Sequence, residues 1–420
     1  MKRETTVGHM ALLLWAGFTI FSQWNTWSID ASALYFSAYF YDLGQTALVY
    51  ASRPEFFMVS PPPEWSALAQ AQGGSADGYS SYVYPPLWAA LLAPIAKNLT
   101  AIGFFNLVTV LNVGSVVAGI YLSYRLLSPN KIGFALWSWV SIGLVQFSLI
   151  GKLAIELGQP QVFVTMLILA SFVALQSGRS RLAGAVLGFA AAIKIAPGYL
   201  AIIFIMERRW AALAMFVGVG AGLAGFSFLV AGPGLHQEFL LRLQDLESHV
   251  LVSRINLTLE SVLLQIQHGI RGASDWAFNR PQVFDKPDWV FWGAKAVLIS
   301  GLCVTYFSTR HLPAGRRIWF RLQLVFLVTL VTSPLAWTHY LIITILLLPG
   351  LIVVASPRFA SLFLLGFWIM FSTGLYGVVY PLHFRGTILV FGGFLAISSL
   401  LAALIWLAIQ QRKPRKAALF

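Results

Sequence analysis

The sequence predicts an all-α polytopic membrane protein, and three observations support this prediction. First, 58% of the 420 residues are hydrophobic and only 10% are charged, whereas soluble domains carry about 25% charged residues. Second, apolar stretches of roughly 20 residues, the length that crosses a bilayer as a helix, recur along the whole chain. Third, no charged block of domain size interrupts these stretches. We therefore expect residues 1–420 to form a single integral membrane domain.

Ten apolar segments are predicted to be full spans. Lys2 and Arg3 precede the first segment, and the basic tail 411–420 follows the last one. Because cytoplasmic loops carry an excess of Lys and Arg, we expect both termini in the cytoplasm, which agrees with an even number of spans. No small-residue cleavage site follows the first segment, so we interpret it as an uncleaved span. The ten segments are 10–27, 101–124, 132–150, 162–175, 210–230, 289–309, 320–335, 340–355, 359–380 and 388–409.

The segment 181–209 does not fit the pattern of a full span. Basic residues flank it on both sides, and Lys194 and Pro197 lie at its centre. By the positive-inside rule both of its ends are cytoplasmic. We interpret it as a helical hairpin of two half-length helices that turns at 194–198. A single span broken at Pro197 is the alternative, and it violates the charge rule.

Two polar loops are expected on the outer side of the membrane, at 28–84 and 232–288. The first contains five acidic residues against the single cation Arg53, and this deficit of basic residues is typical of a non-cytoplasmic loop. Its aromatic, amphipathic part 31–50 predicts an interfacial helix that lies along the membrane surface. The stretch 255–270 in the second loop is also amphipathic.

Composition also limits the possible partners. The net charge of +13 is carried by cations at the ends of apolar segments, which favours contact with anionic lipid over binding of nucleic acid. The single cysteine, Cys303, excludes an intrachain disulfide and a cysteine metal motif. The sequence contains no Walker loop, no HExxH and no Asp-x-Asp. Chemistry without a nucleotide or metal motif suits a donor that is dissolved in the membrane, such as a polyprenyl-phosphate sugar.

Asp30 is the candidate catalytic residue. It lies just after the first span, where a carboxylate is partly desolvated and near the level of lipid headgroups. There it can act as a general base that removes a proton from an attacking hydroxyl. The alternative is structural, because an aspartate directly before ASALYFSAYF is also a good helix N-cap.

Seven further residues are candidates for binding the substrate or the donor. A lysine within an apolar segment is costly, so Lys194 marks either a phosphate site or a cap for carbonyls freed by Pro197. His339 lies between two spans, where a structural hydrogen-bonding role is the alternative. Arg254 is a candidate phosphate clamp. Tyrosines at this level also suit an interfacial aromatic belt. The full set is Tyr35, Tyr84, Gln159, Lys194, Arg254, Asn256 and His339.

The order of several tracts resembles glycosyltransferase family 87, the polyprenol-phosphate-mannose-dependent membrane mannosyltransferases of GT-C architecture. The resemblance covers most of the chain. It rests on Asp30 with Tyr35 after it, and then on YVYPPLWAALLAPIA, GQPQVFVTMLILA, RLAGAVLGFAAAIKIAPGYLAIIFIMERRW, INLTLESVL and TSPLAWTHYLIITILLLP. It implies a GT-C-like bundle and a metal-independent, inverting sugar transfer that needs no cofactor. It also implies that the first-loop aspartate, here Asp30, is the general base.

These observations together predict a hexosyltransferase of the cell envelope. We expect it to move a sugar, mannose by the resemblance, from a polyprenyl-phosphate donor to a hydroxyl of a lipid or glycan acceptor. The expected location is the plasma membrane of a bacterium, with the active site on the outer face. A lipid or solute transporter (a flippase) is the alternative, because a lysine beside a broken helix also suits a binding site at the membrane midplane.

Overall fold

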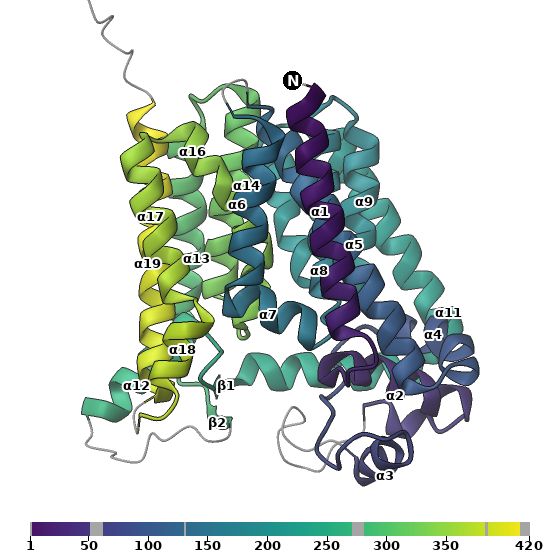
Figure 1. Cartoon of the computed structure of the whole chain (residues 1–420). Coiled ribbons are helices and arrows are strands. Elements are labelled where there is room, and N and C mark those ends of the chain that lie inside the picture. Colours follow the sequence, from purple (N-terminus) through teal and green to yellow (C-terminus); the bar gives the residue numbers. More distant parts are fainter. Residues whose placement is uncertain (1, 51–61, 130–131, 271–280, 383–384, 412–420) are drawn as a thin grey trace, which may run out of the picture.

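The protein is a bundle of helices that stand roughly side by side (Figure 1). The structure, a computed structural model, describes residues 2–50, 62–129, 132–270, 281–382 and 385–411. The N-terminus and the last turn of the final helix lie at one end of the bundle. The first polar loop and a small β-ribbon lie at the other end (Figure 1). We call this second end the loop end.

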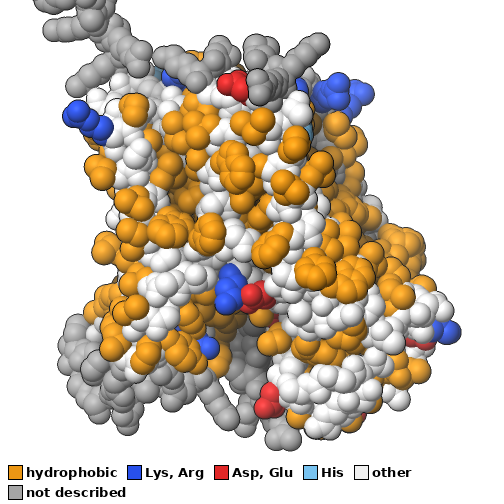
Figure 2. Space-filling view, viewed as in Figure 1, with side chains coloured by type: hydrophobic (Ala, Val, Ile, Leu, Met, Phe, Trp, Pro, Cys, Tyr) orange, Lys and Arg blue, Asp and Glu red, His pale blue; other side chains and the backbone are white. Residues whose placement is uncertain are grey.

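Five helices among the described residues are long and apolar enough to cross a membrane, and a pair bent by 112° adds a sixth if it counts as one span. On the face drawn in Figure 2, apolar side chains cover most of the middle of the molecule, as lipid contact requires. The chain is therefore an integral membrane protein. The five helices are α1 (Lys2–Gln23), α5 (Ala101–Leu127), α11 (Trp210–Ser248), α13 (Asp288–Thr309) and α19 (Arg385–Gln410), and the bent pair is α7 (Leu149–Glu156) with α8 (Gln161–Gln176).

The predicted count of ten full spans is not confirmed, because several apolar segments form shorter helices. The segment 340–355 is divided at Pro349, which has no N–H to continue a helix. The segment 359–380 is divided before Ser372, whose side chain caps the next helix. The shorter elements are α6 (Phe134–Gln146), α14 (Ala314–Val331), η3 (Thr338–Leu341), α15 (Ile342–Leu347), η4 (Leu348–Gly350), α16 (Leu351–Val354), α17 (Pro357–Met370) and α18 (Thr373–Val379).

The segment 181–209 folds as a hairpin, as the charge pattern predicts. Its helices are α9 (Ser180–Ile193), the 3₁₀ helix η2 (Ala196–Ala201) and α10 (Ile202–Met206). Gly184, near the start of α9, packs so closely on Ala212 that an added Cβ would lie 1.9 Å from the Ala212 carbonyl oxygen. Ala212 follows α10 by only a few residues, so both ends of the segment lie at the same level. The chain therefore reverses at Lys194, and the alternative of one broken span is wrong.

The first loop forms a packed layer at the loop end. Its described elements are α2 (Ile29–Asp42), η1 (Thr46–Leu48) and α3 (Pro63–Ala71), and α4 (Pro86–Asn98), which follows the loop, packs against α2 and completes the layer. The expected surface helix is largely buried instead, since nine of the 14 residues of α2 are buried. The reason is aromatic packing: Phe36 of α2 contacts both Trp27 and Trp65. The layer thus holds α2 rigidly against the bundle.

Much of the second predicted loop, 232–288, forms helices and strands among its described residues. Helix α11 continues to Ser248 after a kink at Gly232. The φ of 76° and ψ of 165° at this residue are backbone angles that glycine adopts readily because it has no Cβ. The amphipathic stretch forms α12 (Leu259–Ile270). The strands β1 (His249–Val252) and β2 (Gln282–Asp285) pair antiparallel, with His249 opposite Asp285. This ribbon is a departure from the predicted all-α fold, although almost all other regular structure is helical.

Candidate functional site

Asp30 lies in the first turn of α2, at the loop end of the bundle. The residue at the N-cap position is Ser28, so the interpretation of Asp30 as the cap is wrong. The Asp30 carboxylate instead accepts hydrogen bonds from the Ser80 hydroxyl and from the Gln159 side-chain amide. These partners come from distant parts of the chain, namely the end of the first loop and the turn between α7 and α8. A tertiary site therefore holds this carboxylate.

The turn between α7 and α8 docks directly on the start of α2. The Leu157 carbonyl oxygen accepts hydrogen bonds from the backbone N–H of Asp30 at 2.9 Å and of Ala31 at 3.1 Å. Gly158 has a φ of 66°, and a Cβ added to it would lie 2.8 Å from the Ala31 Cβ. Glycine is therefore required here both for its backbone conformation and for the close approach of the two segments.

Two opposing effects act on the pKa of Asp30. Burial raises the pKa of Asp30 above its ordinary value, and the hydrogen bonds from Ser80 and Gln159 and the charge of Lys194 oppose this rise. Desolvation disfavours the charged carboxylate, while donors and a nearby cation favour it. A carboxyl with a raised pKa is a stronger base when ionised, which is the property that general base catalysis uses.

Lys194 sits at the tip of the hairpin, directly after the last residue of α9. Its Nζ lies 3.7 Å from the centroid of the Tyr340 ring, a geometry that stabilises the ammonium group by cation–π attraction. Its charge also acts on Asp30. The hairpin thus brings the one cation of its apolar tract to the carboxylate of the first loop.

Two further predicted residues lie nearby, Tyr84 close to Asp30 and His339 close to Lys194. The His339 side chain is buried, its ring packs on Tyr340 at 4.9 Å, and within the described part of the chain neither ring nitrogen has a hydrogen-bond partner. Its imidazole is within electrostatic reach of Lys194. Burial and the nearby Asp30 carboxylate raise the pKa of Tyr84. Buried polar groups without partners are rare in proteins, so the imidazole keeps His339 a candidate binding residue.

A cavity of about 350 Å³ opens beside this group. Lys194 and Tyr340 lie on its wall, together with the hairpin tip, the end of α14 and the part of α11 beyond the kink. Most of its other lining side chains are apolar, among them Phe239, Leu243 and Phe326. An apolar cavity with one cation on its wall suits a ligand with a hydrocarbon chain and an anionic head.

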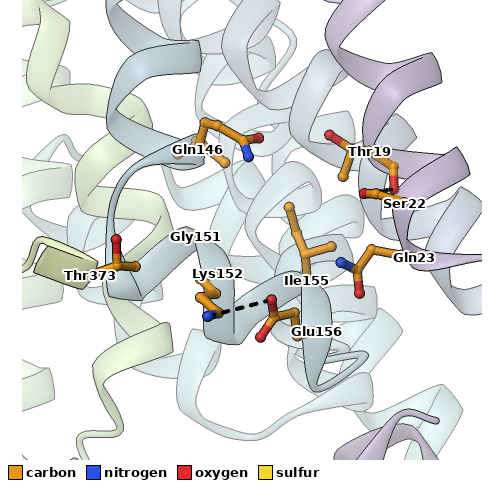
Figure 3. Close-up of a pocket in the computed structure, with 10 residues that line it drawn as sticks. Thr19, Ser22, Gln23, Gln146, Gly151, Lys152, Ile155, Glu156 and Thr373 are labelled. Atoms are coloured by element: carbon orange, nitrogen blue, oxygen red, sulfur yellow. Dashed lines mark hydrogen bonds and ion pairs between the residues drawn. The ribbon is translucent and has the colours of Figure 1, made fainter. Parts of the chain in front are cut away.

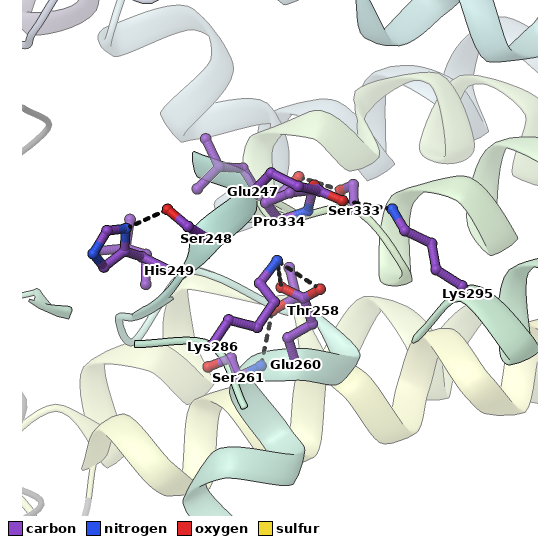
Figure 4. Close-up of polar contacts among 12 residues, drawn as sticks. Glu247, Ser248, His249, Thr258, Glu260, Ser261, Lys286, Lys295, Ser333 and Pro334 are labelled. Carbon is purple, nitrogen blue, oxygen red and sulfur yellow. Dashed lines mark hydrogen bonds and ion pairs between the residues drawn. The ribbon is translucent and has the colours of Figure 1, made fainter. Parts of the chain in front are cut away.

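Ion pairs fasten the walls of this cavity at the loop end (Figure 4). Glu247, on the cavity wall at the end of α11, pairs with Lys295 of α13 at 2.7 Å. Below it, the side chains of Lys286 and Glu260 form a buried pair at 2.9 Å. The first pair ties the end of α11 to α13, and the second ties the residue after β2 to α12.

Three of the predicted site residues lie elsewhere. Tyr35 is buried in the first-loop layer, where its hydroxyl donates to the Leu99 carbonyl at 2.9 Å. Asn256 is fully buried and uses its amide to join Leu251, Pro334 and Ala336. Arg254 lies against the ring of Tyr380 and lines a separate small pocket. Arg254 therefore lines a different pocket from the cavity that Lys194 lines.

Sequence reasoning missed Ser80 and Tyr340. Ser80 lies in a run of small and polar residues without periodicity, so the sequence contains no signal for its contact with Asp30. Tyr340 directly follows His339 in the tract TSPLAWTHY, and an aromatic ring next to a singled-out polar residue was a usable signal.

Comparison with known proteins agrees with the resemblance seen in the sequence. Two relatives are polyprenol-phosphate-mannose-dependent alpha-(1-2)-phosphatidylinositol pentamannoside mannosyltransferases. The one from Mycolicibacterium smegmatis is 25% identical over 341 residues, which are 79% of this chain and 77% of the relative. The one from Mycobacterium tuberculosis is 25% identical over 354 residues, 80% of this chain and 76% of the relative.

The sequence profile of glycosyltransferase family 87 matches residues 82–334. This range is more than half of the chain, and it includes Gln159 and Lys194, although it begins after Asp30. The chain therefore belongs to glycosyltransferase family 87, a family of enzymes that transfer sugars.

Proposed function

We propose that the protein is a membrane mannosyltransferase. It moves a mannosyl group from polyprenyl-phosphate mannose to a hydroxyl of a lipid-linked glycan, on the outer face of the membrane. The relatives' names support this donor and this class of acceptor. The observation that carries the proposal is the Asp30 carboxylate, held by Ser80 and Gln159 close to Lys194 and to an apolar cavity.

In this proposal Asp30 is the general base. The ionised carboxylate takes the proton from the acceptor hydroxyl, and the oxygen attacks the anomeric carbon of the sugar. A new bond forms between this carbon and the acceptor oxygen while the bond to the phosphate oxygen breaks on the opposite face. One displacement from one face inverts the anomeric configuration. The proton leaves Asp30 for water after the product departs.

Lys194 stabilises the leaving phosphate in the same proposal. As the glycosidic bond breaks, negative charge grows on the phosphate oxygens, and a cation in a water-poor site stabilises such charge strongly. The apolar cavity beside Lys194 receives the first part of the polyprenyl chain. With Lys194 in this role, the step needs no metal ion.

The proposed orientation of the protein in the membrane follows from the two ends of the bundle. The positive-inside rule assigns the termini to the cytoplasm, and Figure 1 supports the assignment of the first-loop layer to the opposite side. The loop 28–84, the loop 232–288 and Asp30 then face the outside of a bacterial plasma membrane, and the tail 411–420 faces the cytoplasm. The chain acts as one domain.

The test is an assay of the purified protein in lipid nanodiscs. Polyprenyl-phosphate mannose and a mannosylated phosphatidylinositol are supplied, and the product is isolated and its anomeric configuration determined by NMR. We expect transfer with inversion, and no transfer from a nucleotide-linked mannose. Retention of configuration would contradict the single displacement. Movement of the lipid across proteoliposomes without any product would favour a flippase instead.

A further inference from the structure

A second cavity, of about 270 Å³, lies against α7 and is separate from the cavity beside Lys194. It is bounded by α1, by the end of α6, by α7 and by the start of α18 (Figure 3). Seven of its ten lining residues are polar or charged, in contrast to the apolar cavity beside Lys194. The lining residues are Thr19, Ser22, Gln23, Val145, Gln146, Gly151, Lys152, Ile155, Glu156 and Thr373. We call this cavity the α1–α7 cleft.

The α1–α7 cleft has the chemistry of a carbohydrate site. Lys152 and Glu156 form an ion pair at 3.9 Å in which both side chains stay partly exposed, so each can still donate or accept. The Thr19 hydroxyl is buried and has no partner within the described residues. The side-chain amide oxygen of Gln146 accepts from Trp15, which turns the amide's N–H groups to other partners. Sugars present many adjacent hydroxyls, and this lining offers donors and acceptors together.

The size of the cleft also favours a short sugar over a lipid chain. Pockets for drug-sized ligands begin at about 300 Å³, and the cleft is slightly smaller than that. Val145 and Ile155 add small apolar patches, against which the carbon face of a sugar ring can pack. Figure 3 shows side chains of α1 and of α7 directed toward the same space.

The cleft is connected to the candidate base, Asp30, through α7 and the turn that follows it. Glu156, on the cleft wall, is the last residue of α7. The next residue, Leu157, accepts the backbone hydrogen bond of Asp30, and Gln159 donates to the Asp30 carboxylate. The short helix α7 therefore forms one wall of the cleft, and the turn that follows it holds the carboxylate.

We propose that the α1–α7 cleft binds the hydroxyl-rich headgroup of the acceptor, at sugar units away from the hydroxyl that reacts. The proposal rests on the proposed function, because it assigns the cleft to that reaction's acceptor. The donor, with its polyprenyl chain, occupies the separate apolar cavity. The two substrates then occupy separate cavities.

The test measures binding of each substrate alone, so no turnover takes place. A mannosylated phosphatidylinositol and polyprenyl-phosphate mannose are titrated separately into wild-type nanodiscs. The same titrations use two cleft variants: the double substitution Lys152→Met with Glu156→Gln, and Ser22→Phe, which fills the cleft from α1. A Lys97→Met variant is the control, since it breaks an ion pair with Asp42 of similar length, 3.7 Å, outside the cleft.

We expect both cleft variants to weaken acceptor binding at least about tenfold, the effect of losing one hydrogen bond to a charged group. Donor binding and the melting temperature stay at the wild-type level, and Lys97→Met binds both substrates normally. Unchanged acceptor binding in both variants would overturn the proposal, as would a loss of donor binding alone. A wild-type protein that binds the acceptor but transfers no mannose would overturn the proposed function and leave the cleft assignment standing.

Discussion

The side-chain amide of Gln159 donates a hydrogen bond to the carboxylate of Asp30, and so joins the turn between α7 and α8 to the first turn of α2. The same turn accepts the backbone N–H groups of Asp30 and Ala31 through Leu157. The orientation of the candidate base is therefore set by the docking of two segments that are far apart in the sequence. Changes in this turn should affect activity even where no substrate is touched.

Gly158→Ala should lower activity through this docking. The added methyl group would meet Ala31 at 2.8 Å, in a backbone conformation with φ of 66°. Gly178→Ala is the control, because Gly178 has a similar φ of 78° with no atom within 4 Å of an added Cβ. Both substitutions should destabilise the protein by about 1–3 kcal/mol, but only Gly158→Ala should lower kcat. Equal kcat values in the two variants, measured in nanodiscs, would contradict a positioning role for the turn.

The fall of kcat/KM at acidic pH should follow the protonation of Asp30. The base acts only when ionised, so activity falls as the pH drops through its pKa, which burial raises above the ordinary 3.8. The hydrogen bond from Ser80 lowers that pKa. In Ser80→Ala the pKa of Asp30 therefore rises further, and the acidic limb of kcat/KM moves to higher pH. A limb that stays in place or moves to lower pH would argue that another group titrates.

Lys194→Met should remove the cation that stabilises the leaving phosphate. Loss of one such interaction lowers kcat by roughly 10²–10³-fold, and Lys194→Arg, which keeps the charge, should recover part of it. Lys97→Met, in the first-loop layer, is the matched lysine control. The measurement is single-turnover transfer at saturating donor. A Lys194→Met enzyme with a wild-type rate would exclude the phosphate role.

The base of the hairpin should be a determinant of stability. Glu207 accepts from Arg317 at 2.7 Å and from the buried Arg321 at 2.8 Å. Glu207→Ala leaves Arg321 as a buried cation without its counterion, which typically costs about 3–5 kcal/mol. Glu238→Ala removes a partly exposed partner of Arg242, which keeps Asp245 as a second partner at 3.4 Å, and should cost at most about 1 kcal/mol. Similar melting temperatures in the two variants would refute this account of the hairpin.

The sequence predicted the residues that gather near Asp30 better than it predicted the number of spans. Hydropathy reports removal from water, and a side chain can leave water for protein as well as for lipid. Every residue of α15 (Ile342–Leu347) is buried inside the protein, so the predicted span 340–355 is largely protein core. The charge pattern was more informative for the hairpin, because flanking cations constrain both ends of a segment independently of its apolarity.

Individual site residues were predictable where a charge lies in an apolar tract, because a buried charge is costly without a partner. Lys194 is costly in an apolar tract, and it lies beside Tyr340 and within electrostatic reach of Asp30. Arg254 carries the same charge in a polar loop, where water can solvate it and no protein partner is required. Its side chain lies against the ring of Tyr380. Ser80 is one of several serines in a turn-rich stretch, and only the folded chain identifies which of them reaches Asp30.

The central claim is that Asp30 is the general base, and the most direct measurement is single-turnover mannosyl transfer by Asp30→Asn beside Asp42→Asn. Both aspartates belong to α2, and Asp42 pairs with Lys97 far along the helix. Donor and acceptor binding are measured in each variant. We predict that Asp30→Asn binds both substrates but transfers roughly 10²–10⁴-fold more slowly, while Asp42→Asn transfers at the wild-type rate. An Asp30→Asn enzyme that transfers as fast as the wild type would contradict the account.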